Sequence, residues 1–503
     1  MPSFGFVYDE RMLEHECGYD PTMAERPERM RLIYERLQND GLLNDAIKVE
    51  AREATDEELL LNHSEELLEQ VRALATDEQC EEFCRNKEIL WMSPKSDMAA
   101  RVAAGGCIEL VKACLENRVY NGFAIVRPPG HHSYGKVSQG YCVFNNVAIA
   151  AKIAVERFGI KRVAVVDFDY HPGNGTYYSL KDDPRFHFTS FHAYHHGAFW
   201  PFQREFDYAT GPNQLFVPLN ASMNTEGDFV SVFHHLVIPV LRQFEPELIL
   251  ISAGFDAGYY DIMLEMGQAV KAHGFAHMSR LLSDICPGRT IAVLEGGYFP
   301  ANYVEGAAMM VRALKRMSIP ELALPERLSG ALCSTVWNLL QHHSKEYPHL
   351  RETLEKLQQQ QATLGLPAFV YGQELFFGEK MRRLYDEVKK ANIARTQEWF
   401  PILSEEQILN SNSKIKKYIK DYVFTTDHDI PNEEILMKQL VWDERAQCDS
   451  FLKSAPFCLL LVNEFNDFVE GRIDHMMICD RRLYKLAKAK GSCEDIRRID
   501  FSI

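Results

Sequence analysis

The sequence lacks the features of a membrane-spanning, secreted or disulfide-rich protein. Its 503 residues contain no apolar run near the roughly 20 residues that cross a bilayer. The start, MPSFGFVYDERM, has no basic segment followed by an apolar one, so no signal peptide is expected. The 12 cysteines show no regular spacing and no CxxC pair, which predicts reduced core residues. We therefore expect an intracellular protein, cytoplasmic, nuclear or both.

Basic residues are also fewer than acidic ones. The chain has 55 Lys and Arg against 71 Asp and Glu, a formal net charge of −16. Such an excess of acid disfavours general nucleic-acid binding and is compatible with basic partners such as lysine-rich tails. The alternative explanation is that the negative charge serves only to keep the protein soluble. We predict no direct binding to nucleic acid or to membranes.

What the sequence does contain, over its first two thirds, is an alternation of short β-rich runs and helical stretches. The runs are almost continuously apolar and each ends in glycine, aspartate or histidine. This pattern predicts an α/β fold, an open parallel sheet with helices on both faces. In such sheets the ligand site lies beyond the carboxyl ends of the strands. The expected strands are 121–130, 162–171, 247–257 and 290–298, and the expected helices include 27–42, 98–116, 142–159 and 229–244.

The composition and periodicity of the sequence change near Arg351. Residues 351–365 are polar and helical, residues 415–440 are less periodic, and residues 455–471 return to apolar character. No internal repeat or long low-complexity linker is present. These changes predict one domain over residues 1–350 and a separate, mainly helical C-terminal extension over residues 351–503. The role of that extension is open, with contacts to other proteins as one candidate.

Two strand ends carry residue types that bind metals. Asp167, Asp169 and His171 alternate along one run, so on a strand they share a face. Such a group is costly to bury unless a cation compensates, and aspartate oxygen with histidine nitrogen suits zinc. Asp256 ends a second strand in the same way. Two aspartates and a histidine would leave a fourth position for water or substrate; the ordinary alternative is a solvated strand end.

Two further motifs supply groups for acid–base chemistry. His131 and His132 follow a Pro-Pro-Gly turn and can act as general acid and base beside a metal. Tyr298 follows two glycines at another strand end, and its hydroxyl can donate to a developing oxyanion. A histidine pair or a tyrosine alone is more often structural. The prediction of a catalytic metal site therefore depends on four motifs occurring together: the run from Asp167 to His171, Asp256, the histidine pair and Tyr298.

In this order, over roughly residues 5–350, the four motifs resemble the zinc-dependent histone deacetylases of class II, closest to class IIb. The resemblance implies a catalytic domain with an arginase-like sheet and the chemistry of an amide hydrolase. It implies zinc bound by Asp169, His171 and Asp256. It also implies a structural potassium ion under the zinc, held partly by the backbone and side chains around Asp167, Asp169, His171 and Ser190. The implied catalytic residues are His131, His132, Tyr298, Asp167, which orients the first histidine, and Asn174, which orients the second. The implied substrate-binding residues are Gly140, Tyr141, Trp200 and Met263, the two aromatic ones as walls of an acyl-lysine tunnel.

The sequence departs from the family pattern at several positions expected around the rim of the tunnel. Pro172 replaces the histidine that usually follows the zinc histidine, Tyr141 replaces the more common phenylalanine, and Tyr260 stands where glycine is typical. Met263 lies seven residues beyond Asp256, where the polyamine-deacetylating branch carries a glutamate.

Three functions stay open at this point. The first is deacetylation of lysine side chains in histones or other proteins, with a role in chromatin and transcription regulation, and Met263 favours it over polyamines. The second is a weakly active or inactive scaffold or corepressor. The third is an acetylpolyamine deacetylase.

Overall fold

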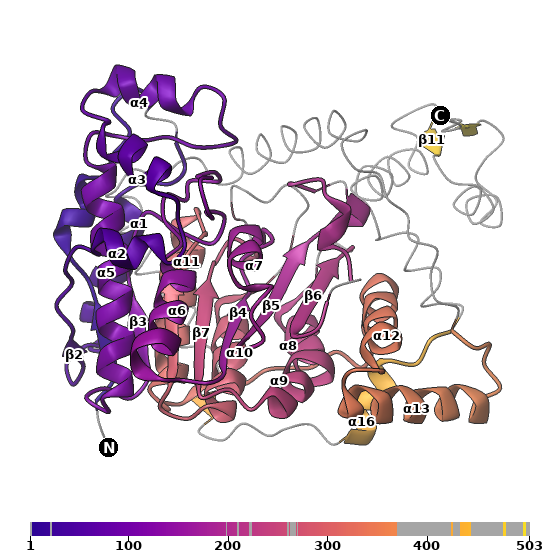
Figure 1. The fold of residues 1–503 in the computed structure, drawn as a ribbon. Coiled ribbons are helices and arrows are strands. Elements are labelled where there is room, and N and C mark those ends of the chain that lie inside the picture. The colour runs from indigo at the N-terminus through magenta and orange to yellow at the C-terminus, as the bar shows by residue number, and fades with distance from the viewer. Residues whose placement is uncertain are drawn as a thin grey trace.

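One sheet of eight parallel strands forms the centre of the molecule (Figure 1). The strand order is β2-β1-β3-β8-β7-β4-β5-β6, which confirms the predicted parallel α/β architecture. The strands are β1 Gly5–Val7, β2 Ile47–Lys48, β3 Gly122–Ala124, β4 Val163–Asp167, β5 Phe186–Ala193, β6 Gln214–Leu219, β7 Leu248–Ala253 and β8 Thr290–Leu294. The computed structural model describes residues 3–20, 23–197, 199–208, 211–220, 224–258, 261, 268, 270–369, 424–425, 433–443, 476–478 and 496–498.

Helices cover both faces of the sheet, as near-continuous apolar strands require (Figure 1). Helices α5 to α7 lie on one face and α8 to α11 on the other, with α1 packed on α11. The helices are α1 Glu28–Asn39, α2 Asp56–Leu60, α3 Glu65–Arg72, α4 Asp77–Cys84, α5 Ser96–Leu115, α6 Asn146–Phe158, α7 Asn174–Leu180, α8 Glu226–Val232, α9 Ile238–Phe244, α10 Ala272–Ile285, α11 Pro300–Leu314, α12 Gly330–His343, α13 Pro348–Thr363 and α16 Glu433–Gln439.

The helix predicted over residues 229–244 is divided in the structure. Helix α8 passes into a π-helical turn, Phe233–Val237, before α9 begins. Pro239 lies at the start of α9 and has no N–H, so it cannot bond to the carbonyl of His235. The wider π turn accommodates that missing bond.

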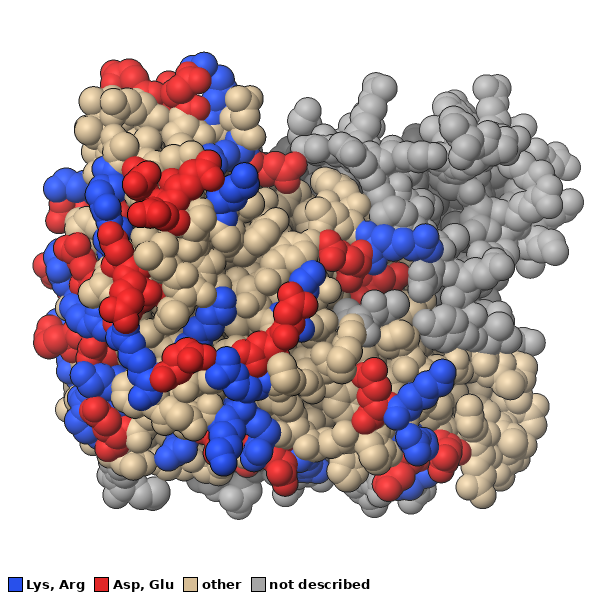
Figure 2. All heavy atoms as spheres, viewed as in Figure 1, with Lys and Arg blue, Asp and Glu red and all other residues tan. Residues whose placement is uncertain are grey.

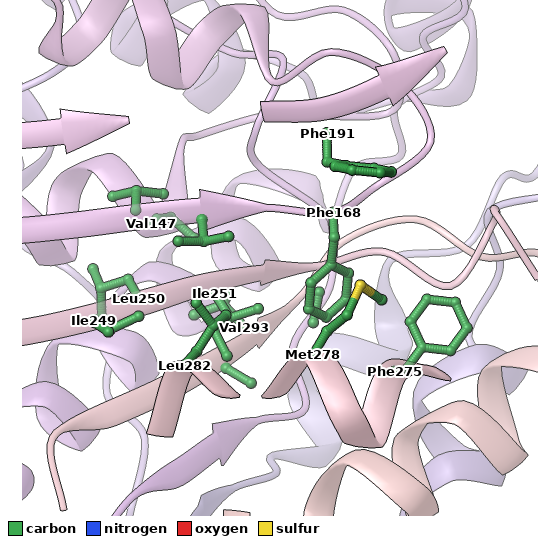
Figure 3. Packing of buried hydrophobic residues seen from close by; sticks show 14 of the residues in the cluster. Val147, Phe168, Phe191, Ile249, Leu250, Ile251, Phe275, Met278, Leu282 and Val293 are labelled. Atoms are coloured by element: carbon green, nitrogen blue, oxygen red, sulfur yellow. The ribbon is translucent and has the colours of Figure 1, made fainter. Parts of the chain in front are cut away.

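The hydrophobic core includes the central strands whose carboxyl ends carry the polar motifs. Ile249, Leu250 and Ile251 on β7 are fully buried, which fits a central strand with apolar neighbours on both faces. Figure 3 shows these side chains close to residues of β8 and α10. Beyond the end of β4, the rings of Phe168 and Phe275 approach to 5.7 Å between centroids. The sheet is therefore a rigid base for the loops that follow it.

Part of the predicted C-terminal extension packs against the sheet domain. The indole N–H of Trp337 in α12 donates to the Leu440 carbonyl at 2.7 Å. Within the predicted extension, Gln361 in α13 donates to the Trp442 carbonyl at 2.8 Å. Helix α13 itself crosses residue 350. The boundary at that residue stays a prediction, and the apolar stretch 455–471 lies outside the described residues.

Acidic and basic side chains interleave on the face of the molecule seen in Figure 2. The negative net charge is therefore not gathered into one patch on this face. Within the described ranges, no helix combines the length and apolar character needed to cross a membrane.

The core predicts a contrast between two leucines. Leu250→Ala removes a side chain with no exposed surface, and we expect a loss of about 2–5 kcal/mol in unfolding free energy. Leu60→Ala, at a residue 45% exposed, should change it by no more than about 0.5 kcal/mol. Denaturant unfolding of both variants measures this, and equal losses would contradict the position given to β7.

Candidate active site

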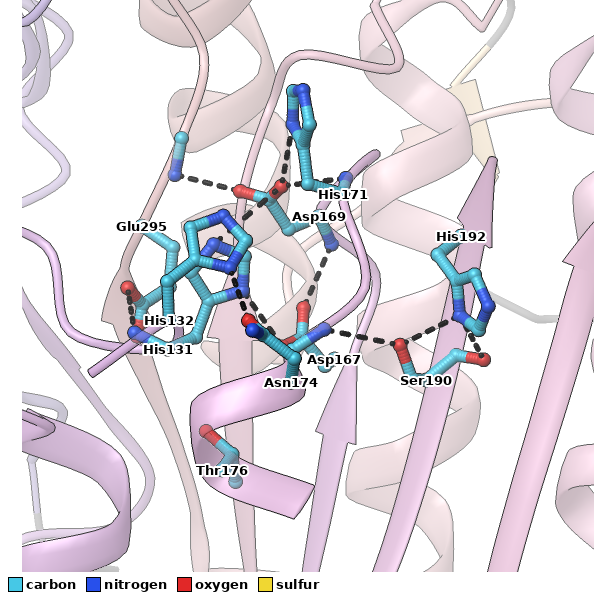
Figure 4. A network of polar contacts seen from close by, with 12 residues as sticks. His131, His132, Asp167, Asp169, His171, Asn174, Thr176, Ser190, His192 and Glu295 are labelled. Carbon is cyan, nitrogen blue, oxygen red and sulfur yellow. Dashed lines mark hydrogen bonds and ion pairs between the residues drawn. The ribbon is translucent and has the colours of Figure 1, made fainter. Parts of the chain in front are cut away.

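Polar residues follow four neighbouring strands, β3, β8, β7 and β4, and meet beyond their carboxyl ends (Figure 4). The expectation that Asp167, Asp169 and His171 share one strand face is wrong, because β4 ends at Asp167. Asp169 and His171 lie in the following bend. Hydrogen bonds orient them instead: Asp169 N donates to Asp167 Oδ1 at 3.1 Å, and His171 N donates to Asp169 Oδ1 at 2.9 Å.

Asp169, His171 and Asp256 form a compact donor set. One ligand atom from each lies within 4.8 Å of the others, and His171 Nδ1 is 2.9 Å from Asp256 Oδ2. Backbone N–H groups also donate to the two carboxylates: Gly296 N donates to Asp169 at 2.8 Å, and Tyr170 N donates to Asp256 at 2.8 Å. The three residues predicted as zinc ligands are therefore brought together.

The electrostatics of this set call for a cation. Burial raises the pKa of Asp256 to about 6, helped by the neighbouring Asp169 charge. Burial alone would lower the pKa of His171, but hydrogen bonds and charges from Asp169 and Asp256 raise it to about 10. Oxygen, nitrogen and oxygen donors fit a zinc ion with one open position.

Glycines make room for the first carboxylate. A Cβ atom at Gly254 would lie 2.0 Å from Asp169 Oδ2, and one at Gly296 would lie 2.4 Å from it. No real Cβ contact is that short. Both glycines are therefore required by the close approach of Asp169 to two neighbouring strand ends.

The tandem histidines have different partners. His131 Nδ1 lies 3.0 Å from Asp167 Oδ2, and His132 Nδ1 lies 2.8 Å from Asn174 Oδ1. Burial opposes charge on His131, but Asp169 and Asp167 raise its pKa to about 10. Burial and the charges of His131 and His171 hold the pKa of His132 well below its usual value. The two surroundings therefore shift the imidazoles in opposite directions, His131 toward its charged form and His132 toward its neutral form.

Tyr298 is held beside these groups by its backbone. The N–H groups of Tyr298 and Phe299 donate to Asp261 Oδ2 at 2.7 and 3.0 Å. The guanidinium of Arg29 lies 4.8 Å from the Tyr298 ring centroid, and its Nε donates to the Gly297 carbonyl at 2.7 Å. Burial raises the pKa of Tyr298 well above its ordinary value, so the phenol keeps the proton that it would donate.

Aromatic residues enclose the polar groups. Tyr141 lies 5.6 Å from the Tyr298 ring, and Trp200 lies edge-on to His132 at 4.7 Å between centroids. Gly140 allows this packing, since a Cβ atom there would lie 2.4 Å from His132 Cδ2. Tyr260 and Met263 lie outside the described residues.

The sequence prediction missed three supporting residues. Glu295 accepts the N–H groups of Gly130 and His131 at 2.7 and 3.1 Å and so fixes the histidine loop. Its position directly before the two glycines was the available signal. Asp261 and Arg29 had no such signal, because both act through contacts with the Tyr298 loop far away in the chain.

A second donor group, His131, Cys142 and Glu295, also lies within 4.8 Å. Its histidine nitrogen Nδ1 already faces Asp167, and burial raises the pKa of the Cys142 thiol well above its ordinary value. This group therefore supports the histidine loop. Ser190 lies beside Asp167 in the sheet register, and its Oγ accepts Gly173 N at 3.4 Å. The potassium ion expected there stays a prediction.

Comparison with known proteins gives consistent relatives. A family model for the histone deacetylase domain matches residues 23–314. The human protein "Polyamine deacetylase HDAC10" is 39% identical over 368 residues, covering 71% of this chain and 54% of the relative. "Histone deacetylase 5" of Arabidopsis thaliana is 33% identical over 338 residues, covering 64% and 51%. The chain spans about half the length of these curated relatives.

A solved structure supports the same fold. The crystal structure of the HDA15 HD domain aligns with a TM-score of 0.63 at 30% identity, covering 71% of this chain and 98% of that domain. This likeness confirms the deacetylase-like sheet that the sequence predicted.

The donor set predicts one bound zinc ion. The wild-type protein should contain about one equivalent of zinc, and Asp256→Ala should lose it, because one of three protein ligands is removed. Elemental analysis of the purified proteins measures this. Asp182→Ala, a change of an exposed carboxylate away from the set, is the control and should keep the metal. Full occupancy in Asp256→Ala would contradict the ligand assignment.

Proposed function

This chain belongs to the histone deacetylase family, and from that premise we propose that it is a zinc-dependent hydrolase that removes acetyl groups from lysine side chains of histones or other proteins. The observation that carries the proposal is the Asp169, His171 and Asp256 donor set beside a buried histidine pair whose members face different partners, His131 facing Asp167 and His132 facing Asn174.

The residues of the site divide the work as follows. Zinc, when bound by Asp169, His171 and Asp256, supplies a Lewis acid for the amide carbonyl and lowers the pKa of water. The contact of His132 Nδ1 with Asn174 leaves Nε2 free to take a proton from the attacking water. His132 then returns a proton to the leaving lysine amine.

The other polar groups support the transition state. His131, held by Asp167, provides electrostatic support for the developing oxyanion. Tyr298 donates its hydroxyl to that oxyanion, and its buried phenol is protonated at neutral pH. A tyrosine here favours an enzyme over a scaffold, since weakly active class IIa relatives carry histidine at this position.

Pro172 does not prevent a suitable geometry. His171 N still donates to Asp169, and His171 Nδ1 still faces Asp256. This supports catalytic competence despite the departure from the family pattern.

We propose acetyl-lysine in proteins as the substrate, in the cytoplasm or nucleus. Polyamine deacetylases are among the relatives, so acetylpolyamines are the second candidate. Met263 disfavours them, because its thioether carries no charge to attract a distal ammonium. We also propose a structural potassium ion near Asp167 and Ser190.

Tyr298→Phe tests the oxyanion role. Loss of the hydroxyl should lower kcat on an acetyl-lysine peptide by roughly a hundredfold, while zinc content and fold are retained. Tyr34→Phe, which removes the hydroxyl of a tyrosine stacked on Tyr8, should leave turnover unchanged. Near-normal turnover in Tyr298→Phe would instead indicate a different electrophile.

Met263→Glu tests substrate choice. The new carboxylate should raise activity on acetylspermidine relative to an acetyl-lysine peptide, because a charged contact contributes about 1–3 kcal/mol. Met263→Gln, which adds polarity without charge, is the control and should have little effect. A wild-type kcat/KM that is higher for acetylspermidine than for the peptide would overturn the preference.

A further inference from the structure

The loop that follows α4 contacts both aromatic walls of the proposed tunnel. The indole N–H of Trp200 donates to Glu88 Oε2 at 2.6 Å. The neighbouring carbonyls of Glu88 and Ile89 accept Gly140 N at 2.9 Å and Tyr141 N at 2.8 Å. Glu88 and Ile89 therefore link two segments that lie 59 residues apart in the chain, Tyr141 and Trp200.

The backbone of this loop is strained where it meets the walls. Ile89 has a φ of 48°, in the left-handed region that β-branched residues rarely adopt. Its side chain is nevertheless 42% exposed, so burial of Ile89 does not offset the strain. Strain of this kind persists where the surrounding structure over-determines it, and it gathers at functional sites. Here the bonds to Gly140 and Tyr141 hold the conformation.

Buried residues immediately after Ile89 fix the loop in place. Trp91 stacks on His15 with 4.0 Å between centroids, and Met92 N donates to the hydroxyl of Tyr19 at 3.3 Å. Leu90 is also buried. The Glu88 carboxylate is thus presented from an anchored backbone, which makes it a suitable fixed acceptor for an indole.

The bond to Glu88 sets the orientation of a ring that contacts the chemistry. Trp200 is only 7% exposed and lies edge-on to His132 and, at 6.3 Å, to His171. The Glu88 carboxylate oxygen accepts this indole N–H at 2.6 Å, although Glu88 itself is exposed. A phenylalanine in place of Trp200 would have no N–H to hold.

We propose that Glu88 is a positioning residue of the tunnel: it fixes Trp200 against His132, and Ile89 forms the exposed lip beside it. The hydrogen bond between Glu88 and Trp200 stands independently of the reaction. Its effect on turnover rests on the proposed function.

A double-mutant cycle tests the role in catalysis. Glu88→Ala should raise KM for an acetyl-lysine peptide by roughly tenfold with a smaller change in kcat, because a loosened wall weakens binding of the lysine stem. Glu88→Gln should restore KM to within about threefold, since its amide oxygen also accepts the indole N–H. In a Trp200→Phe background, Glu88→Ala should add less than about a twofold change. Glu81→Ala, an exposed glutamate in α4, is the control and should not change KM.

Two kinetic outcomes would overturn the proposal. Equal increases in KM from Glu88→Ala in both backgrounds would mean that Glu88 acts on the substrate directly. No increase in either background would mean that the wall needs no support.

A spectroscopic measurement is independent of turnover. The contribution of Trp200 to the near-UV circular dichroism is the spectrum of the wild type minus that of Trp200→Phe. The same difference measured in the Glu88→Ala background should not be the same. An unchanged difference would overturn the proposal. If the wild type deacetylates none of the substrates, the proposed function fails while this optical test of the Glu88 contact still gives an answer.

Discussion

Burial of four carboxylates at one edge of the sheet is the constraint on which the rest of the structure depends. Asp167, Asp169, Asp256 and Glu295 have almost no exposed surface. A buried carboxylate is costly unless it is paired or hydrogen-bonded, and here every one has a partner. The imidazoles and backbone N–H groups around them come from three different strand ends, those of β3, β4 and β8. The geometry of the site follows from satisfying these charges.

A buried ion network carries that constraint into the first 30 residues. Arg127 makes a bidentate pair with Glu25, and Arg29 bonds to Glu25 as well as to the carbonyl of Gly297. Removing one member of such a network leaves a buried charge unpaired, which typically costs about 3–5 kcal/mol. The start of the chain therefore belongs to the support of the Tyr298 loop, although it contributes no reacting group.

The base and the rim of the site differ in how they are held. At the base, carboxylates and backbone donors fix the histidines within a few ångströms. At the rim, the backbone N–H of Tyr141 and the indole N–H of Trp200 donate to the Glu88–Ile89 loop. Residues at a rim of this kind can change without disturbing the base. This explains how the departures from the family pattern, such as Tyr141, coexist with an intact set of polar groups.

The sequence by itself determined the alternation of strands and helices and the four motifs at the strand ends. Both were legible because apolar runs and short polar motifs are local patterns. It did not reveal β1, β2, β5 or β6. In β5, the buried His187 and His192 look polar until their hydrogen bonds are known. Only the tertiary structure decided that Asp169 and His171 converge through a bend beyond β4, and that Arg29 and Glu88 support the site. Their partners lie 268 and 112 residues away in the chain, and contacts across such separations leave no local pattern to read.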